Sequence, residues 1–202
     1  MNDVTRLAHL EGVLDFLRAA EQLKVKTRSA YTSEGKPESV AEHSWRLCLM
    51  ALVLRDEFPD VHFERLIAIC VVHDLGEAIR GDVPAPVQAE RLARDPTAHK
   101  SADEREDLLK LLSPLPASAR AHLTALWDEY EAAVTREARV AKALDKLETI
   151  LQHTQGVNPP EFDYRFNLGY GRAFTSGDAV IVRLRELLDE ETSSRMKAAG
   201  SE

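Results

Sequence analysis

Apolar residues recur at steps of three and four positions along most of this chain, which is the spacing of amphipathic α-helices. Near the N-terminus, a stripe of leucines keeps this spacing: Leu7, Leu10, Leu14 and Leu17. Together with capping and turn signals, the pattern predicts helices over residues 5–23, 39–58, 62–79, 99–112, 116–134, 135–155 and 178–197. Strand patterns, internal repeats and a domain linker are not evident. We therefore predict an all-α fold, with residues 1–202 forming one helical bundle.

Three segments interrupt the helical pattern and are predicted to be loops, residues 24–37, 81–86 and 156–177. Each is rich in turn-forming residues, and Pro84 and Pro86 cannot both occupy a helix interior. After the first loop, Ser39 is followed three positions later by Glu42. This pair is a capping-box pattern and predicts where the second helix begins.

The overall composition is that of a globular protein with an acidic surface. Of the 202 residues, 44% are hydrophobic and 30% are charged, and the formal net charge is -8. Broad binding of nucleic acid needs a surplus of Lys and Arg, so we expect none. The sequence has no apolar run long enough to span a membrane, no signal-peptide pattern, and only two cysteines, Cys48 and Cys70. These features favour the cytoplasm.

Polar groups interrupt the most apolar predicted helix. His73 and Asp74 directly follow Val71 and Val72, and Glu77 comes four residues after His73. On a continuous helix, this spacing would place His73 and Glu77 on one face. Because a buried polar group without a partner is costly, an imidazole beside two carboxylates suggests a hydrolytic metal site.

Two further polar residues interrupt apolar helical runs, His43 in the second predicted helix and Asp145 in the sixth. A lone histidine on a helix is more often a core or cap residue than a ligand. A lone aspartate is more often the ion-pair partner of a nearby Lys or Arg. Spacing alone does not show whether either residue approaches His73.

Three segments of this chain resemble the HD superfamily of metal-dependent phosphohydrolases. They are residues 39–44 (SVAEHS), 73–84 (HDLGEAIRGDVP) and 143–148 (ALDKLE). A His-Asp dipeptide is a weak signal, but the three segments in this order and spacing are specific. They are similar to the subgroup of bacterial 5'-deoxynucleotidases and their eukaryotic relatives. The resemblance covers about residues 16–155, and residues 156–202 form a C-terminal loop and helix beyond it.

The resemblance implies a helical HD-type bundle that holds one divalent cation. The implied metal ligands are His43, His73, Asp74 and Asp145. Such ligands suit Mn²⁺, Co²⁺, Fe²⁺ or Zn²⁺. The positions of Glu77 and Asp82 match residues that handle the attacking water, with Glu77 as the proton-transfer group and Asp82 as its partner in positioning.

The resemblance also assigns Arg28 to the substrate phosphate, which a guanidinium can bind with two hydrogen bonds. Without the resemblance, Arg28 would be interpreted as a solvated cation in a loop. In the bacterial enzymes, a tryptophan that follows this arginine tests the sugar for a missing 2'-hydroxyl. Here the residue is Ser29, and the nearest aromatic is Tyr31. We therefore expect weaker selection for deoxyribose than in those enzymes.

The expected activity is that of a 5'-nucleotidase acting on nucleoside or deoxynucleoside 5'-monophosphates. The alternatives are a phosphodiesterase or phosphatase for another small phosphate ester, and a non-catalytic module that binds metal or nucleotide. Because no implied ligand is missing from the sequence, an enzyme is favoured. The resemblance also suggests a homodimer. The other histidines have no matching partners and are predicted to be surface or structural residues: His9, His62, His99, His122 and His153.

Overall fold

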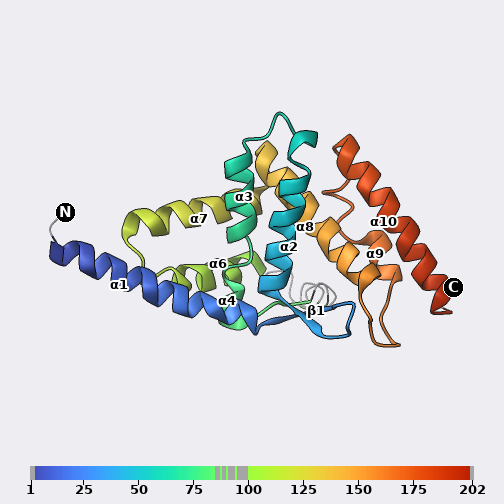
Figure 1. Ribbon diagram of the computed structural model, residues 1–202, viewed down its shortest axis with the longest axis horizontal. Helices are drawn as coiled ribbons and strands as arrows, with labels where there is room; N and C mark the ends of the chain where they lie inside the picture. The colour runs from blue at the N-terminus through green and yellow to red at the C-terminus, as the bar shows by residue number, and fades with distance from the viewer. Residues whose placement is uncertain (1–2, 85–86, 88–89, 91–93, 95–99, 201–202) are drawn as a thin grey trace.

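The computed structural model shows helices packed around a central helix, α8 (Figure 1). The structure describes residues 3–84, 87, 90, 94 and 100–200. The α-helices are α1 (Asp3–Ala20), α2 (Val40–Val53), α3 (Phe63–Val72), α4 (Glu77–Arg80), α6 (Lys100–Leu111), α7 (Ala117–Ala132), α8 (Arg136–Gln155), α9 (Arg165–Gly169) and α10 (Ala179–Ala198). The described residues also form two 3-10 helices, η1 (Glu21–Lys24) and η2 (Arg55–Glu57), and two strands, β1 (Thr27–Tyr31) and β2 (Pro37–Ser39). The prediction of an all-α fold is confirmed.

The central helix α8 begins at a side-chain cap, because the Thr135 hydroxyl accepts a hydrogen bond from the backbone N–H of Ala138. Its Leu144, Leu147 and Ile150 are fully buried. Helices α2, α3, α7 and α10 all pack against it. As a result, most side chains of α8 are buried, and the polar ones include Asp145, Glu148 and Gln152.

The predicted loop over residues 24–37 is wrong in part, because β1 and β2 form an antiparallel hairpin there. Thr27 lies opposite Ser39 and Tyr31 lies opposite Pro37. Gly35 closes the turn with a φ of 77°, a left-handed conformation that favours glycine. The alternating pattern is too short to see in the sequence. Strand β1 packs on α8, and this packing places Arg28 of β1 against the bundle.

The predicted helix over residues 62–79 is also wrong in part: it is helical in two pieces, because α3 ends at Val72 and α4 begins only at Glu77. Between them the backbone forms turns with hydrogen bonds between residues three apart. The N–H of Leu75 donates to the carbonyl of Val72, and the N–H of Glu77 donates to the carbonyl of Asp74. His73 and Glu77 therefore do not share one face of a continuous helix. The predicted loop over 156–177 likewise contains the short helix α9. The predicted helix start at His99 and the loop positions 85 and 86 lie outside the described residues.

Helix α1 is present, but its leucine stripe is not the face that packs. Leu7, Leu10, Leu14 and Leu17 are all at least half exposed. Val13, Phe16 and Ala19 contact the core instead. Helices α1 and α10 extend toward opposite ends of the molecule, α1 toward the N-terminus and α10 toward the C-terminus (Figure 1). Among the described residues, the helices are too short or too polar to cross a bilayer.

We expect Gly76→Ala to destabilise the fold, because Gly76 brings the turn after α3 against α6. A Cβ at this position would lie 2.7 Å from the backbone oxygen of Glu104. Such overpacking typically costs about 1–3 kcal/mol. The matched control is Gly177→Ala, where a Cβ would meet nothing within 4 Å. Urea unfolding of both variants measures the difference, and equal midpoints would contradict the close approach.

Candidate metal centre

The capping box predicted at Ser39 places His43 in the first turn of α2. The Ser39 hydroxyl accepts from the N–H of Glu42 at 3.2 Å, and the Glu42 carboxylate accepts from the N–H of Ser39 at 2.7 Å. His43 lies on the same face of α2 as Leu47 and Ala51, and all three side chains are fully buried. The helix start therefore directs this imidazole into the bundle.

His73 and Asp74 lie where α3 gives way to the tight turn. The Nδ1 atom of His73 lies 2.8 Å from the carbonyl oxygen of Cys70, which can accept a hydrogen bond from Nδ1–H. With the proton on Nδ1, the lone pair of Nε2 is directed into the bundle. Asp74 Oδ2 is 3.0 Å from this Nε2 atom.

Asp145 projects from the middle of α8 and is buried. Its Oδ2 atom accepts hydrogen bonds from the Tyr130 hydroxyl at 2.5 Å and the Lys146 ammonium at 2.7 Å. Its Oδ1 atom lies 3.2 Å from His43 Nε2. One oxygen of Asp145 is therefore held by the protein, and the other faces the histidines.

Residues from three helices converge at this point. Ligand atoms of His43, His73 and Asp145 lie within 4.8 Å of one another. Asp74 Oδ2 also lies 3.8 Å from His43 Nε2. The Nε2 atoms of both histidines are buried and make no hydrogen bond to any described residue. Because a buried nitrogen normally has a partner, two such nitrogens beside two carboxylates fit a divalent metal ion.

The electrostatics of the site favour positive charge between its carboxylates. Burial alone would raise the pKa of Asp145, but Lys146, His43 and His73 hold it well below its usual value. The pKa of Asp74 is also lowered against the effect of burial, by His73, His43 and Arg28. Burial and Arg28 would lower the pKa of His43, yet Glu148 and Asp145 raise it to about 10. A bound cation would satisfy the same carboxylates.

Arg28 reaches the site from β1 and contacts three residues of it. Its Nη1 atom lies 3.4 Å from Asp74 Oδ2, its Nη2 atom donates to Thr149 Oγ1 at 3.0 Å, and its Nε atom lies 3.5 Å from Glu38 Oε2. Burial would lower the pKa of Arg28, but Asp74 first and Asp82 next raise it. Asp82 thus acts on Arg28 electrostatically, and Glu77 is buried at the start of α4.

The sequence did not identify a second buried group behind His43. Glu38, His43 and Glu148 also have ligand atoms within 4.8 Å of one another. Burial first, and then the charge of Glu148, raise the pKa of Glu38 to about 7. Glu148 follows Asp145 by three residues on α8, so the two share one helix face. The available signals were this spacing and the place of Glu148 in the segment 143–148 that carries the resemblance, because burial cannot be read from sequence.

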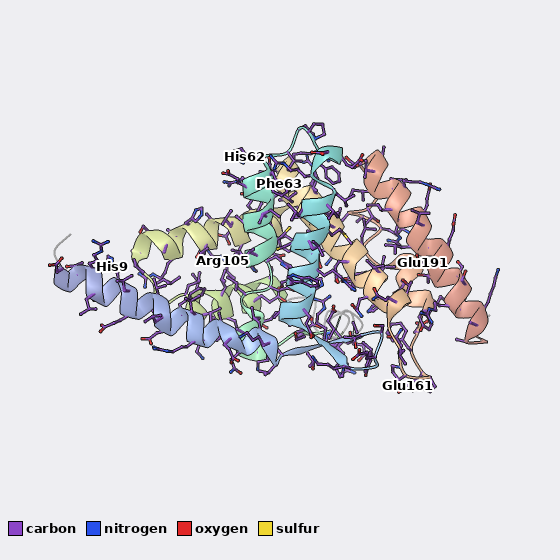
Figure 2. The ribbon with its side chains drawn as sticks, viewed as in Figure 1. His9, His62, Phe63, Arg105, Glu161 and Glu191 are labelled. Atoms are coloured by element: carbon purple, nitrogen blue, oxygen red, sulfur yellow. The ribbon has the colours of Figure 1, made fainter. Side chains whose placement is uncertain are left out.

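The histidines predicted to lie outside the site include His9 and His62, and Figure 2 shows both at the edge of the molecule, His9 on α1 and His62 at the start of α3. His73 is at the other end of α3. His122 is exposed, and His99 lies outside the described residues. His153 is buried and has a structural partner, since its Nδ1 atom lies 2.7 Å from Asn167 Oδ1.

Comparisons with known proteins point to one family. The model of the HD domain family matches residues 20–181. The human protein named 5'-deoxynucleotidase HDDC2 is 34% identical over 194 residues, covering 95% of this chain and 91% of the relative. The fission yeast 5'-deoxynucleotidase hdd1 is 31% identical over 159 residues, covering 77% of this chain and 75% of the relative.

The fold is also similar to that of solved proteins. A predicted metal-dependent phosphohydrolase from Magnetospirillum magnetotacticum superposes with a TM-score of 0.77 at 27% identity, covering 93% of this chain and 94% of that one. A conserved hypothetical protein from Pyrococcus furiosus gives a TM-score of 0.60 at 27% identity, covering 88% and 98%. By sequence and by fold, then, the chain belongs to the HD domain family.

Proposed function

We propose that this chain is a metal-dependent phosphohydrolase that removes phosphate from nucleoside and deoxynucleoside 5'-monophosphates. The observation that carries the proposal is the convergence of His43, His73 and Asp145, with two buried imidazole nitrogens that make no hydrogen bond to a described residue. Relatives named 5'-deoxynucleotidase, which match 95% of the chain, support the nucleotide as substrate.

In this proposal His43, His73, Asp74 and Asp145 hold one divalent cation, either Mn²⁺, Co²⁺, Fe²⁺ or Zn²⁺. Such an ion polarises a phosphoryl oxygen and makes water a better nucleophile at neutral pH. The protein residues keep the ligands fixed: Tyr130 and Lys146 each donate to Asp145, and the carbonyl of Cys70 orients His73.

Arg28 binds the substrate phosphate in this proposal. Its Nη1 atom lies 3.4 Å from Asp74 Oδ2, so the guanidinium would lie beside an ion that Asp74 holds. Its planar donors suit two phosphate oxygens at once, which a lysine could not match. The contacts to Glu38 and Thr149 hold the side chain in this orientation before substrate binds.

Glu77 serves as the proton-transfer group, and Asp82 helps to position the attacking water. Glu77 is buried at the start of α4, three residues after Asp74, and a carboxylate near the metal ligands is suited to accept a proton from water. Asp82 follows α4, and its charge helps to raise the pKa of Arg28, which links the two parts of the proposed site.

The direct test is a substrate panel. Chelator-treated protein is supplied with each of the four metals in turn, and release of inorganic phosphate is measured from 5'-monophosphates, 3'-monophosphates, a nucleoside triphosphate and a cyclic dinucleotide. We expect metal-dependent turnover of the 5'-monophosphates and little of the others. Turnover only of a cyclic dinucleotide, or none with any metal, would contradict the proposal.

We expect His73→Ala and Asp145→Ala each to lose bound metal and activity while keeping most of their helix content. Removing one ligand leaves the remaining carboxylate or imidazole groups with a much weaker hold on the ion. Elemental analysis of purified protein measures the metal, and circular dichroism measures the helix content. His122→Ala, which changes an exposed histidine, is the control. Full metal occupancy in both site variants would rule out this ligand set.

Glu77→Gln should keep the metal but lose about 10²–10⁴-fold in kcat, the usual contribution of a general acid or base. The amide is nearly the same size as the carboxylate, so the fold should be retained. The measurement is kcat at saturating nucleotide, with metal content checked in parallel. A decrease of less than about tenfold would move the proton-transfer role to Asp82, for which Asp82→Asn is the comparison.

We expect the preference for deoxyribose over ribose to be below about a hundredfold in kcat/KM, or less than ~3 kcal/mol. Ser29 is exposed, whereas Arg28 and Ala30 on either side of it on β1 are more buried. Ser29 therefore offers no bulky group that would exclude a 2'-hydroxyl by contact. Half-buried Tyr31 is the remaining aromatic candidate. Matched assays of dAMP and AMP with one metal provide the ratio. A strict requirement for dAMP would refute the expectation, and Tyr31→Ala would then show whether the ring is responsible.

A further inference from the structure

A carboxylate stands directly behind His43, on the side away from the proposed metal. Glu148 Oε2 accepts a short hydrogen bond from His43 Nδ1, and both side chains are fully buried. The opposite nitrogen of the same ring, Nε2, faces Asp145. The imidazole therefore bridges two carboxylates of α8, one on each side of the ring.

The arrangement follows from matching three-residue steps on two packed helices. On α8, Asp145 and Glu148 are three residues apart, and on α2, His43 and Arg46 are three residues apart. Residues at this spacing lie on one helix face. Because α2 packs on α8, the two pairs face each other, and Glu148 contacts both His43 and Arg46.

Arg46 holds the Glu148 carboxylate in the position from which it bonds to His43. Its Nε and Nη2 atoms each lie 2.6 Å from Glu148 Oε1, so one oxygen of Glu148 is held by the guanidinium and the other by the imidazole. A fully buried carboxylate without such partners would be strongly destabilising. With both oxygens occupied, Glu148 has little freedom to turn away from His43.

The neighbouring group of Glu38, His43 and Glu148 satisfies the distances of a second ion site, but its charges are already compensated. Arg28 Nε lies 3.5 Å and Arg46 Nη2 lies 3.9 Å from the Glu38 carboxylate. Two guanidinium groups thus accompany two carboxylates, and His43 Nδ1 is engaged by Glu148. A divalent cation there would have to displace these cations, which favours a role in positioning instead.

We propose that Glu148, anchored by Arg46, is a positioning residue that keeps the proton of His43 on Nδ1 and its Nε2 lone pair directed at the metal. The inference rests on the proposed function, because it assumes that His43 binds the ion. Partners that orient a ligating histidine commonly contribute 10–100-fold to metal affinity. Glu148 itself touches neither the ion nor the substrate.

The test is calorimetric titration of metal-free protein with Zn²⁺, comparing wild type with Glu148→Gln. Glutamine keeps the size of the side chain but removes the charge that favours the Nδ1–H tautomer. We expect the Kd for Zn²⁺ to rise 10–100-fold, while the KM for nucleotide at saturating metal stays within about twofold of wild type. Glu190→Gln, an exposed change on α10 that removes the same charge, should leave both quantities unchanged.

Two further measurements distinguish a positioning role of Glu148 from a purely structural one. Nitrogen-15 NMR of the zinc-loaded wild type should show His43 protonated at Nδ1, and Arg46→Gln should weaken Zn²⁺ binding in the same direction as Glu148→Gln. A folded Glu148→Gln variant that binds Zn²⁺ as tightly as wild type would overturn the inference and leave the metal site intact. If wild type itself bound no Zn²⁺, Mn²⁺, Co²⁺ or Fe²⁺, the proposed function would fail, and the inference with it.

Discussion

Charged side chains buried in a helical bundle must be paired, and this chain buries several of them where α2, α3 and α8 meet. The contacts of His43 with Glu148 and Asp145 compensate much of that charge. The neighbouring elements then contribute further groups: the β-hairpin brings Arg28 and Glu38, and the end of α3 brings His73 and Asp74. The packing of α2 on α8 therefore stabilises the bundle and also assembles the candidate metal centre.

The sequence predicted the helices well where apolar spacing and capping agreed. The capping box at Ser39 marks the observed start of α2, and the stripe on α8 is the centre of the core. The errors arose where tertiary contacts override local pattern. The close approach of Gly76 to α6 accompanies the break after α3, and the packing of β1 on α8 orders a segment that resembled a loop. The leucines of α1 kept helical spacing but do not contact the core.

The candidate site was predictable as a set of residue types, but not as a geometry. The motif resemblance supplied His43, His73, Asp74 and Asp145, although the helix-face argument for His73 and Glu77 depended on a helix that is broken. Glu148 escaped notice because a glutamate in a helix usually faces solvent, and only the three-dimensional contact with His43 shows otherwise. Networks of this kind depend on burial and partners far apart in the sequence.

The location of the bound ion tests the account most directly. Crystals grown with Mn²⁺ and measured at the manganese absorption edge would reveal it as an anomalous peak. The account predicts that the strongest peak lies within bonding distance of the Nε2 atoms of both His43 and His73. A strongest peak on the other side of the His43 ring, between Glu38 and Glu148, would contradict it, and so would the absence of any peak at this junction of α2, α3 and α8.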